Sequence, residues 1–161
     1  MENREEQLNA AYSCFYKAFE RFNRVVWSGS LPRCVIRFYR GRGGRRLAFA
    51  QNSCPPQISF NLSRCLYLPE PFIWGVMAHE MTHIWQFSQG RAGGHGKDFH
   101  REMLRAGLDE KQGIVLPGTP GNYVFSLNEI SPVSLLGALK VIEACSEFSE
   151  KEFTTHFFIN N

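Results

Sequence analysis

The segment from Pro69 to Gln89 constrains the fold of this chain more than any other part of it. Pro69 and Pro71 flank Glu70 in the first turn of a predicted helix, where proline is tolerated, and Gly90 follows the last turn. Most residues between these ends are apolar around the whole helical circumference, which is typical of a helix buried on every side. A fold of this chain must therefore place this helix near its centre.

Three ionisable residues interrupt the apolar helix as His79-Glu80-Met81-Thr82-His83, an H-E-x-x-H motif. Residues four apart lie on one face of a helix, about 6 Å apart along its axis, so both imidazoles can reach one metal ion. The glutamate between them is placed to take a proton from a water on that metal. Burying these groups as ordinary core side chains would cost several kcal/mol, which favours a metal as their partner.

A catalytic zinc ion needs a third protein ligand and one position open to water. His95 follows His83 by twelve residues and lies between glycines, which allow the backbone to turn back toward the helix. The spacing favours His95 as the third ligand. Three other side chains nearby stay open as alternatives: Asp98, His100 and Glu102. His156 stands alone among apolar residues, which is typical of a packed or solvent-facing histidine.

Two runs carry a resemblance to a known family: Ala78-His79-Glu80-Met81-Thr82-His83 and Gly94-His95-Gly96-Lys97-Asp98-Phe99. They are similar to the motifs of the SprT-like (Spartan-type) zinc metalloproteases, which pair H-E-x-x-H with a downstream H-G-x-x-F or H-G-x-x-W. The resemblance covers about residues 5–108. It implies Zn²⁺ as cofactor, His79, His83 and His95 as metal ligands, and Glu80 as the catalytic base. Many bacterial members carry a Cys-based zinc ribbon after this core, and this chain has none.

The predicted fold class is α+β, a zincin-like metalloprotease core with helices packed on a small three-stranded sheet. An amphipathic helix is predicted over residues 4–26, strands over 33–40, 46–51 and 57–62, and a shorter helix over 98–106. The glycines between residues 41 and 44 predict that the first two strands form a hairpin.

The last part of the chain has no counterpart in the resemblance. Residues 123–127 read as a short strand, Pro132 to about Glu147 as a helix capped by Ser131, and Glu152–Ile159 as a final strand. We expect residues 1–112 to form the metalloprotease core and residues 113–161 to form a C-terminal extension packed on it.

The cysteine content and the N-terminal residues indicate in which cellular compartment the protein is expected. There are five cysteines, an odd number without any C-x-x-C pair, which argues against a disulfide framework and fits a reducing environment. The first nine residues are too polar for a signal peptide, and no apolar run approaches the ~20 residues needed to cross a bilayer. We expect a cytoplasmic protein without membrane contact.

Five arginines gather near the predicted hairpin although the net charge is only +3: Arg37, Arg40, Arg42, Arg45 and Arg46. With interleaved aromatic residues they would suit nucleic acid, arginines contacting phosphate and aromatics stacking on bases. The resemblance favours DNA as a partner, because several SprT-like members digest proteins attached to DNA. The alternative is a solvated turn whose aromatics face the core. Strand alternation puts Ile36 and Phe38 opposite Arg37 and Tyr39, so not every aromatic can be exposed.

These features together predict a zinc metallopeptidase that acts on a protein or peptide substrate, with DNA-associated proteins as one candidate class. Two other interpretations stay open. One is a narrow-specificity peptidase, amidase or toxin-like effector, and the other is a non-catalytic binding module with a structural zinc. Glu80 argues against the module, because a structural site has no use for a base beside its ligands.

Overall fold

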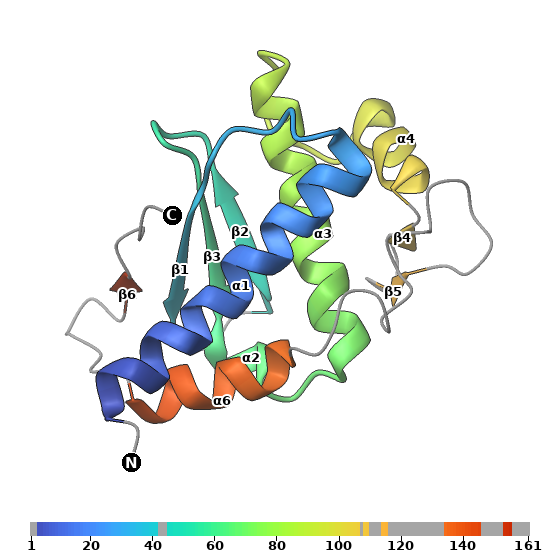
Figure 1. Cartoon of the computed structure of the whole chain (residues 1–161). Helices are drawn as coiled ribbons and strands as arrows, with labels where there is room; N and C mark the ends of the chain where they lie inside the picture. The colour runs from blue at the N-terminus through green and yellow to red at the C-terminus, as the bar shows by residue number, and fades with distance from the viewer. Residues whose placement is uncertain are drawn as a thin grey trace.

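The computed structural model describes residues 3–41, 45–106, 108–109, 114–115, 134–145 and 153–155 (Figure 1). The helices are α1 (Arg4–Trp27), α2 (Leu62–Cys65), α3 (Glu70–Ser88), α4 (Lys97–Arg105) and α6 (Leu135–Cys145). The strands are β1 (Val35–Tyr39), β2 (Ala48–Gln51), β3 (Gln57–Asn61), β4 (Leu108–Asp109), β5 (Ile114–Val115) and β6 (Phe153–Thr155). The α+β class predicted from the sequence is confirmed.

A mixed sheet with the order β2-β3-β1-β6 forms the centre of this arrangement. Strand β1 runs parallel to β3, whereas β2 and β6 run antiparallel to their neighbours. The three predicted strands are all present, and the short β6 adds a fourth at the far edge. Strands β4 and β5 pair separately as a two-stranded sheet.

The hairpin predicted between β1 and β2 is wrong, because β3 lies between them. Strand β3 is the more deeply buried, with Ile58, Ser59 and Phe60 fully shielded from solvent, so it takes a central position. The side chain of Asn61 at its end accepts a hydrogen bond from Gly41 N–H (3.0 Å) and donates one to the Arg46 carbonyl (2.9 Å). It thereby holds both ends of the segment that crosses from β1 to β2.

Helix α1 covers one face of the sheet, as its amphipathic pattern predicted (Figure 1). Its buried Tyr12 and Phe15 meet Phe38 of β1 edge to face, with ring centroids 5.2 and 4.8 Å apart. Aromatic pairs in this geometry stabilise a core beyond the area they bury. On the other face of β1, Arg37 and Tyr39 are only half-buried, in keeping with the predicted alternation.

Helix α3 lies beside β2 and is the central helix that the sequence predicted (Figure 1). Its Ile73, Met77 and Met81 are completely buried. Its first residue, Glu70, accepts hydrogen bonds from the backbone N–H groups of Leu135 (2.5 Å) and Leu136 (2.9 Å). The start of α3 thus caps α6, which also packs against α1.

Some predicted features fall partly or wholly outside the described residues. The described parts of the predicted helix 132–147 and of the predicted strand 152–159 are α6 and β6. The predicted strand 123–127, Arg42 and His156 lie outside the described residues. All five cysteines are free thiols. Among the helices that the structure describes, none is long and apolar enough to cross a membrane. The division at residue 112 and the cytoplasmic location stay predictions.

Candidate metal centre

Three histidines converge where α3 approaches the loop that leads to α4. His79 and His83 project from consecutive turns of α3 and are half-buried, whereas His95 comes from the loop and is exposed. One nitrogen of each ring lies within 4.8 Å of the others, and the Nε2 atoms of His83 and His95 are 3.2 Å apart. Two nitrogens bound to one tetrahedral zinc ion at ~2.0–2.1 Å are about 3.3 Å apart. The His83–His95 spacing therefore matches that of two zinc ligands, and the three histidines form a group that could hold one metal ion.

The three alternative ligands have other partners or places in the fold. Asp98 forms an ion pair with Arg91 at 3.1 Å, and Glu102 accepts a hydrogen bond from Trp27 Nε1 at 3.0 Å. Within the described part of the chain, the group of side chains able to hold a metal contains neither of them, nor His100.

Phe99 of α4 forms the apolar floor of the histidine group. The ring is fully buried, and its centroid lies 5.0 Å from that of His79, 4.5 Å from His83 and 4.8 Å from His95. An aromatic residue four positions after His95 thus contacts all three imidazoles. This packing gives a physical reason for the aromatic position in the H-G-x-x-F pattern.

The glycines between α3 and α4 turn the chain back on itself. Gly90 adopts a left-handed backbone conformation (φ 71°), and the next N–H, of Arg91, bonds to the Gln86 carbonyl at 3.0 Å. A Cβ atom on Gly93 would lie 3.0 Å from the Phe87 ring, closer than most Cβ contacts in proteins. This close approach brings the loop, and with it His95, against the end of α3.

Gln86 is a site residue that the sequence analysis missed. It is only 2% exposed, its Oε1 lies 2.8 Å from His83 Nδ1, and its Nε2 donates to the Gly94 carbonyl at 2.9 Å. The available signal was its place three residues after His83 in an otherwise apolar helix, which puts both side chains on one face.

The electrostatics of the site favour neutral imidazoles. Burial, with smaller contributions from His83 and His95, lowers the pKa of His79 to about 4. Burial also lowers the pKa of His83, although its hydrogen bond with Gln86 opposes the shift. Neutral imidazole is the form that binds metal, so these rings are ready to act as ligands near neutral pH.

Glu80 belongs to α3, and its side chain reaches the backbone of β2. It is 6% exposed, and burial raises the pKa of its carboxyl group to about 8. The charge of Arg46 and a hydrogen bond from the backbone of Ala50 oppose this shift. That hydrogen bond places the outer edge of β2 next to the carboxyl group. A carboxyl group that can hold or release a proton near neutral pH, next to His79 of a candidate metal centre, is suited to proton transfer.

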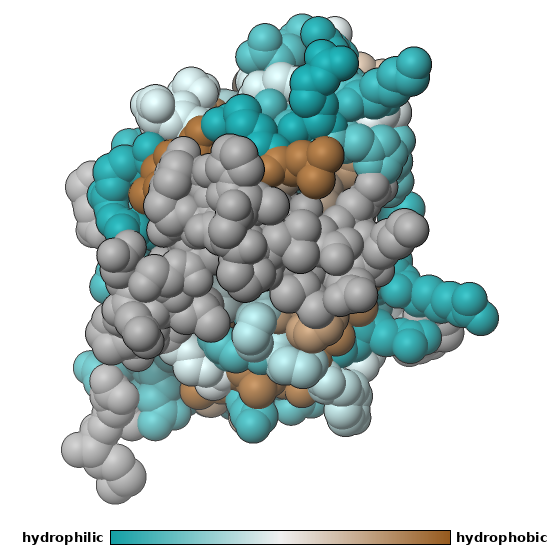
Figure 2. All heavy atoms as spheres, turned by 90° about the vertical axis from the view of Figure 1, so that its right-hand side faces the viewer, coloured by the Kyte–Doolittle hydropathy of each residue, from teal (hydrophilic) through white to brown (hydrophobic). Residues whose placement is uncertain are grey.

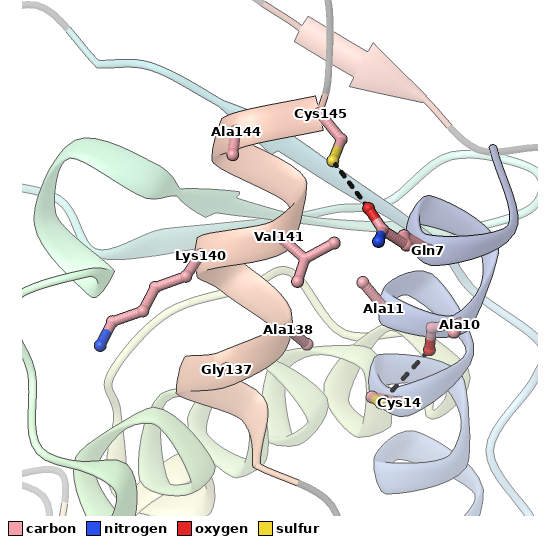
Figure 3. Close-up of a pocket in the computed structure, with 10 residues that line it drawn as sticks. All are labelled: Gln7, Ala10, Ala11, Cys14, Gly137, Ala138, Lys140, Val141, Ala144 and Cys145. Atoms are coloured by element: carbon pink, nitrogen blue, oxygen red, sulfur yellow. Dashed lines mark hydrogen bonds between the residues drawn. The ribbon is translucent and has the colours of Figure 1, made fainter. Parts of the chain in front are cut away.

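A separate cavity of about 550 Å³ lies between α1 and α6 (Figure 3). Its walls are mainly small and apolar, and the Cys14 thiol that lines it donates to the Ala10 carbonyl at 3.3 Å. Among the described residues, no group of side chains there is arranged to hold a metal. The histidine group is therefore the better candidate for a functional centre.

A three-histidine group on a helix and its following loop, with a buried carboxyl group beside it, defines a candidate metal centre of the metallohydrolase type. The model of the SprT-like family matches residues 15–115. The chain therefore belongs to the SprT-like family, which is zinc-metalloprotease-like. No curated protein and no solved structure matches the chain significantly.

Proposed function

We propose that this protein is a zinc-dependent peptidase that hydrolyses peptide bonds in protein substrates. The observation that carries the proposal is the convergence of His79, His83 and His95 beside the buried carboxyl group of Glu80. The three histidines would hold the ion. When bound, zinc supplies a Lewis acid that polarises a carbonyl group and makes water more acidic.

Glu80 would act as the proton carrier of the reaction. Its carboxylate accepts a proton from the attacking water as the new C–O bond forms, and returns it to the amide nitrogen as the C–N bond breaks. Burial favours the protonated form of this group in the metal-free protein. The positive charge of a divalent ion beside it lowers its pKa, so that the carboxylate is available at neutral pH.

The edge of β2 is where we expect the substrate backbone to bind. Within the described part of the chain β2 has one neighbouring strand, β3, so no other strand pairs with its outer edge. The Ala50 backbone on this edge hydrogen-bonds to Glu80. An extended peptide that added to β2 by backbone hydrogen bonds would pass directly beside that carboxyl group.

The test compares zinc-loaded wild type with Glu80→Gln on a loosely folded protein substrate. We expect the wild type to cleave the substrate and the variant to be inactive while it still holds one zinc per chain. Loss of zinc from the variant would make Glu80 a ligand and overturn its assigned role. A zinc-loaded wild type that cleaves no general substrate would favour a narrow-specificity hydrolase or a binding module.

We also propose DNA as a partner, because five arginines lie between residues 37 and 46. Arg40, Arg45 and Arg46 are exposed, and so are the cations Lys97 and Arg101 of α4. The upper part of the face shown in Figure 2 is largely hydrophilic. Because the Arg40 guanidinium pairs with Glu143 at 2.9 Å, we expect the other cations to contribute more of the attraction.

The DNA proposal is tested by the binding of fluorescent single-stranded DNA over a range of salt concentrations. Phosphate contacts predict a steep fall of affinity with salt, and Arg45→Ala should make that slope shallower. A wild type that binds no DNA at low salt would remove DNA from the list of partners. Cleavage measured with and without DNA then shows whether DNA stimulates the peptidase.

A further inference from the structure

Gln86 connects His83 with the loop that carries His95 through a single side chain. It lies three residues after His83 on α3, is 2% exposed, and faces the loop that carries His95. Its Oε1 is 2.8 Å from His83 Nδ1, and its Nε2 donates to the Gly94 carbonyl at 2.9 Å. The Gly94 N–H also approaches Oε1, at 3.4 Å.

The backbone of Gly94 fixes which way the Gln86 amide points. The carbonyl oxygen of Gly94 needs a donor, and the Gln86 NH₂ group supplies it. A flipped amide would instead bring its oxygen against that carbonyl oxygen and its NH₂ group against the Gly94 N–H. Both contacts would be repulsive, so the observed orientation is the favoured one.

This orientation decides the tautomer of His83. The Gln86 carbonyl oxygen can only accept a hydrogen bond, so Nδ1 of the neutral His83 ring must carry the hydrogen. The ring nitrogen without a hydrogen is then Nε2, which lies 3.2 Å from His95 Nε2. A metal ligand needs its lone pair on the nitrogen that faces the ion, and this tautomer puts it there.

The same amide holds the loop on which His95 lies. Gly94 immediately precedes His95, and its carbonyl oxygen is bound to the Gln86 side chain. The neighbouring Gly93 lies so close to Phe87 that an added Cβ atom would come within 3.0 Å of its ring. Both glycines thus contact the end of α3, Gly93 at Phe87 and Gly94 at Gln86.

We propose that Gln86 is a positioning residue of the metal centre. Its oxygen sets the tautomer and ring orientation of His83, and its nitrogen holds the His95 loop in reach of the same ion. The proposal rests on the proposed function in taking His79, His83 and His95 as the metal ligands.

Two variants test the roles of the amide oxygen and the amide nitrogen of Gln86 separately. Gln86→Leu removes the hydrogen bonds at both ends of the amide, whereas Gln86→Glu keeps an acceptor for His83 and loses the donor to Gly94. The matched control is Gln89→Leu, which makes the same change at the exposed C-cap position directly after α3. Zinc affinity is measured by competition with a coloured chelator, and the geometry of the site by the visible absorption of the cobalt-substituted protein.

We expect Gln86→Leu to lower zinc affinity about 10–100-fold and to change the cobalt spectrum, as the loss of such supporting groups does. Gln86→Glu should bind zinc more tightly than Gln86→Leu, because it still accepts the His83 hydrogen. Gln89→Leu should match the wild type. The proposal is overturned if Gln86→Leu keeps wild-type affinity, or if Gln86→Glu binds no better than Gln86→Leu.

One measurement on the unaltered protein keeps the test independent of how the variants fold. The nitrogen chemical shifts of His83 in the metal-free wild type, recorded by NMR, report directly which ring nitrogen is protonated. We expect the hydrogen on Nδ1, and a hydrogen on Nε2 would refute the proposal. None of these readouts uses peptide hydrolysis, so a protein that binds zinc but cleaves nothing would overturn the peptidase function alone.

Discussion

Two glutamates of α3, ten residues apart, have opposite surroundings. The carboxylate of Glu70 accepts hydrogen bonds from the Leu135 and Leu136 backbone, from Trp74 Nε1 (3.2 Å) and from Ser134 Oγ (3.1 Å). Glu80 is buried, and in the described structure the influences that favour its charged form are the Arg46 charge and the Ala50 backbone.

Glu70 has the surroundings of a structural carboxylate, whereas Glu80 has those of a group suited to proton transfer. Four donors stabilise the charge of Glu70 and use the acceptor capacity of both its oxygens. Glu80 keeps acceptor capacity to spare, and its burial destabilises its ionised form. A fold retains such an unfavourable group most readily where the group has a function.

The largest expected difference between the two glutamates is in turnover. Glu80→Gln should lower kcat about 10²–10⁴-fold, because it removes the proton carrier, whereas Glu70→Gln should leave kcat near the wild-type value. Peptide cleavage by each variant, with zinc content measured on the same samples, checks this. Equal losses in both variants would mean that Glu80 acts through the fold rather than in the reaction.

Sequence patterns predicted the parts of this molecule that depend on local spacing. The H-E-x-x-H pair and the glycine-flanked His95 were found because helical periodicity and one short loop determine their positions. The roles of Glu70 and Gln86 were missed because their partners are backbone groups of Leu135 and Gly94, which a side-chain pattern does not show.

The strand order was mispredicted for a related reason. The glycines after β1 indicate a turn, but they do not determine whether β2 pairs with β1 or with β3 after that turn. That choice depends on the deep burial of β3 and on the hydrogen bonds of Asn61 across the end of the sheet. Both are tertiary interactions, and they override the local turn signal.

The second expected effect is stabilisation by zinc. Free zinc at about a thousand times its dissociation constant should raise the free energy of unfolding by about 4 kcal/mol, because only the folded chain brings the three histidines together. Denaturant unfolding with zinc and with a chelator measures this. Glu70→Gln should show the full increase and His83→Ala little of it. A similar increase in His83→Ala would place the ion elsewhere.

The third expected effect is a pH dependence specific to Glu80 in the zinc-free protein. The pKa of Glu80 is raised from 4.5 to about 8, so between these pH values the folded chain keeps a proton that the unfolded chain releases. Stability from this group is therefore lost as pH rises through that window. Glu80→Gln removes the loss and should exceed the wild type by a few kcal/mol above pH 8 and match it below pH 5.

His79 acts in the opposite direction and does not disturb this test. Its pKa is lowered to about 4, so stability falls as pH decreases from 6.5 toward 4, when the unfolded chain takes up the proton first. That loss of stability occurs equally in wild type and in Glu80→Gln, so it cancels when their free energies of unfolding are subtracted. Urea unfolding of both proteins from pH 5 to pH 9 makes the measurement. A difference that does not change with pH would contradict the burial of an ionisable Glu80.

The smallest expected effect is the loss of stability caused by replacing Glu70. In Glu70→Gln an NH₂ group replaces one of the two oxygens that accept hydrogen bonds at the start of α6, which should lower the free energy of unfolding by about 1–2 kcal/mol. For a chain of this size that corresponds to a fall in Tm of roughly 2–8 °C. The matched control is Glu143→Gln on α6, which breaks only an exposed pair with Arg40 and should cost less than about 1 kcal/mol. If the two variants were equally stable, the hydrogen bonds to Leu135 and Leu136 would not hold α6 on α3, and Glu70 would no longer differ from an ordinary surface glutamate.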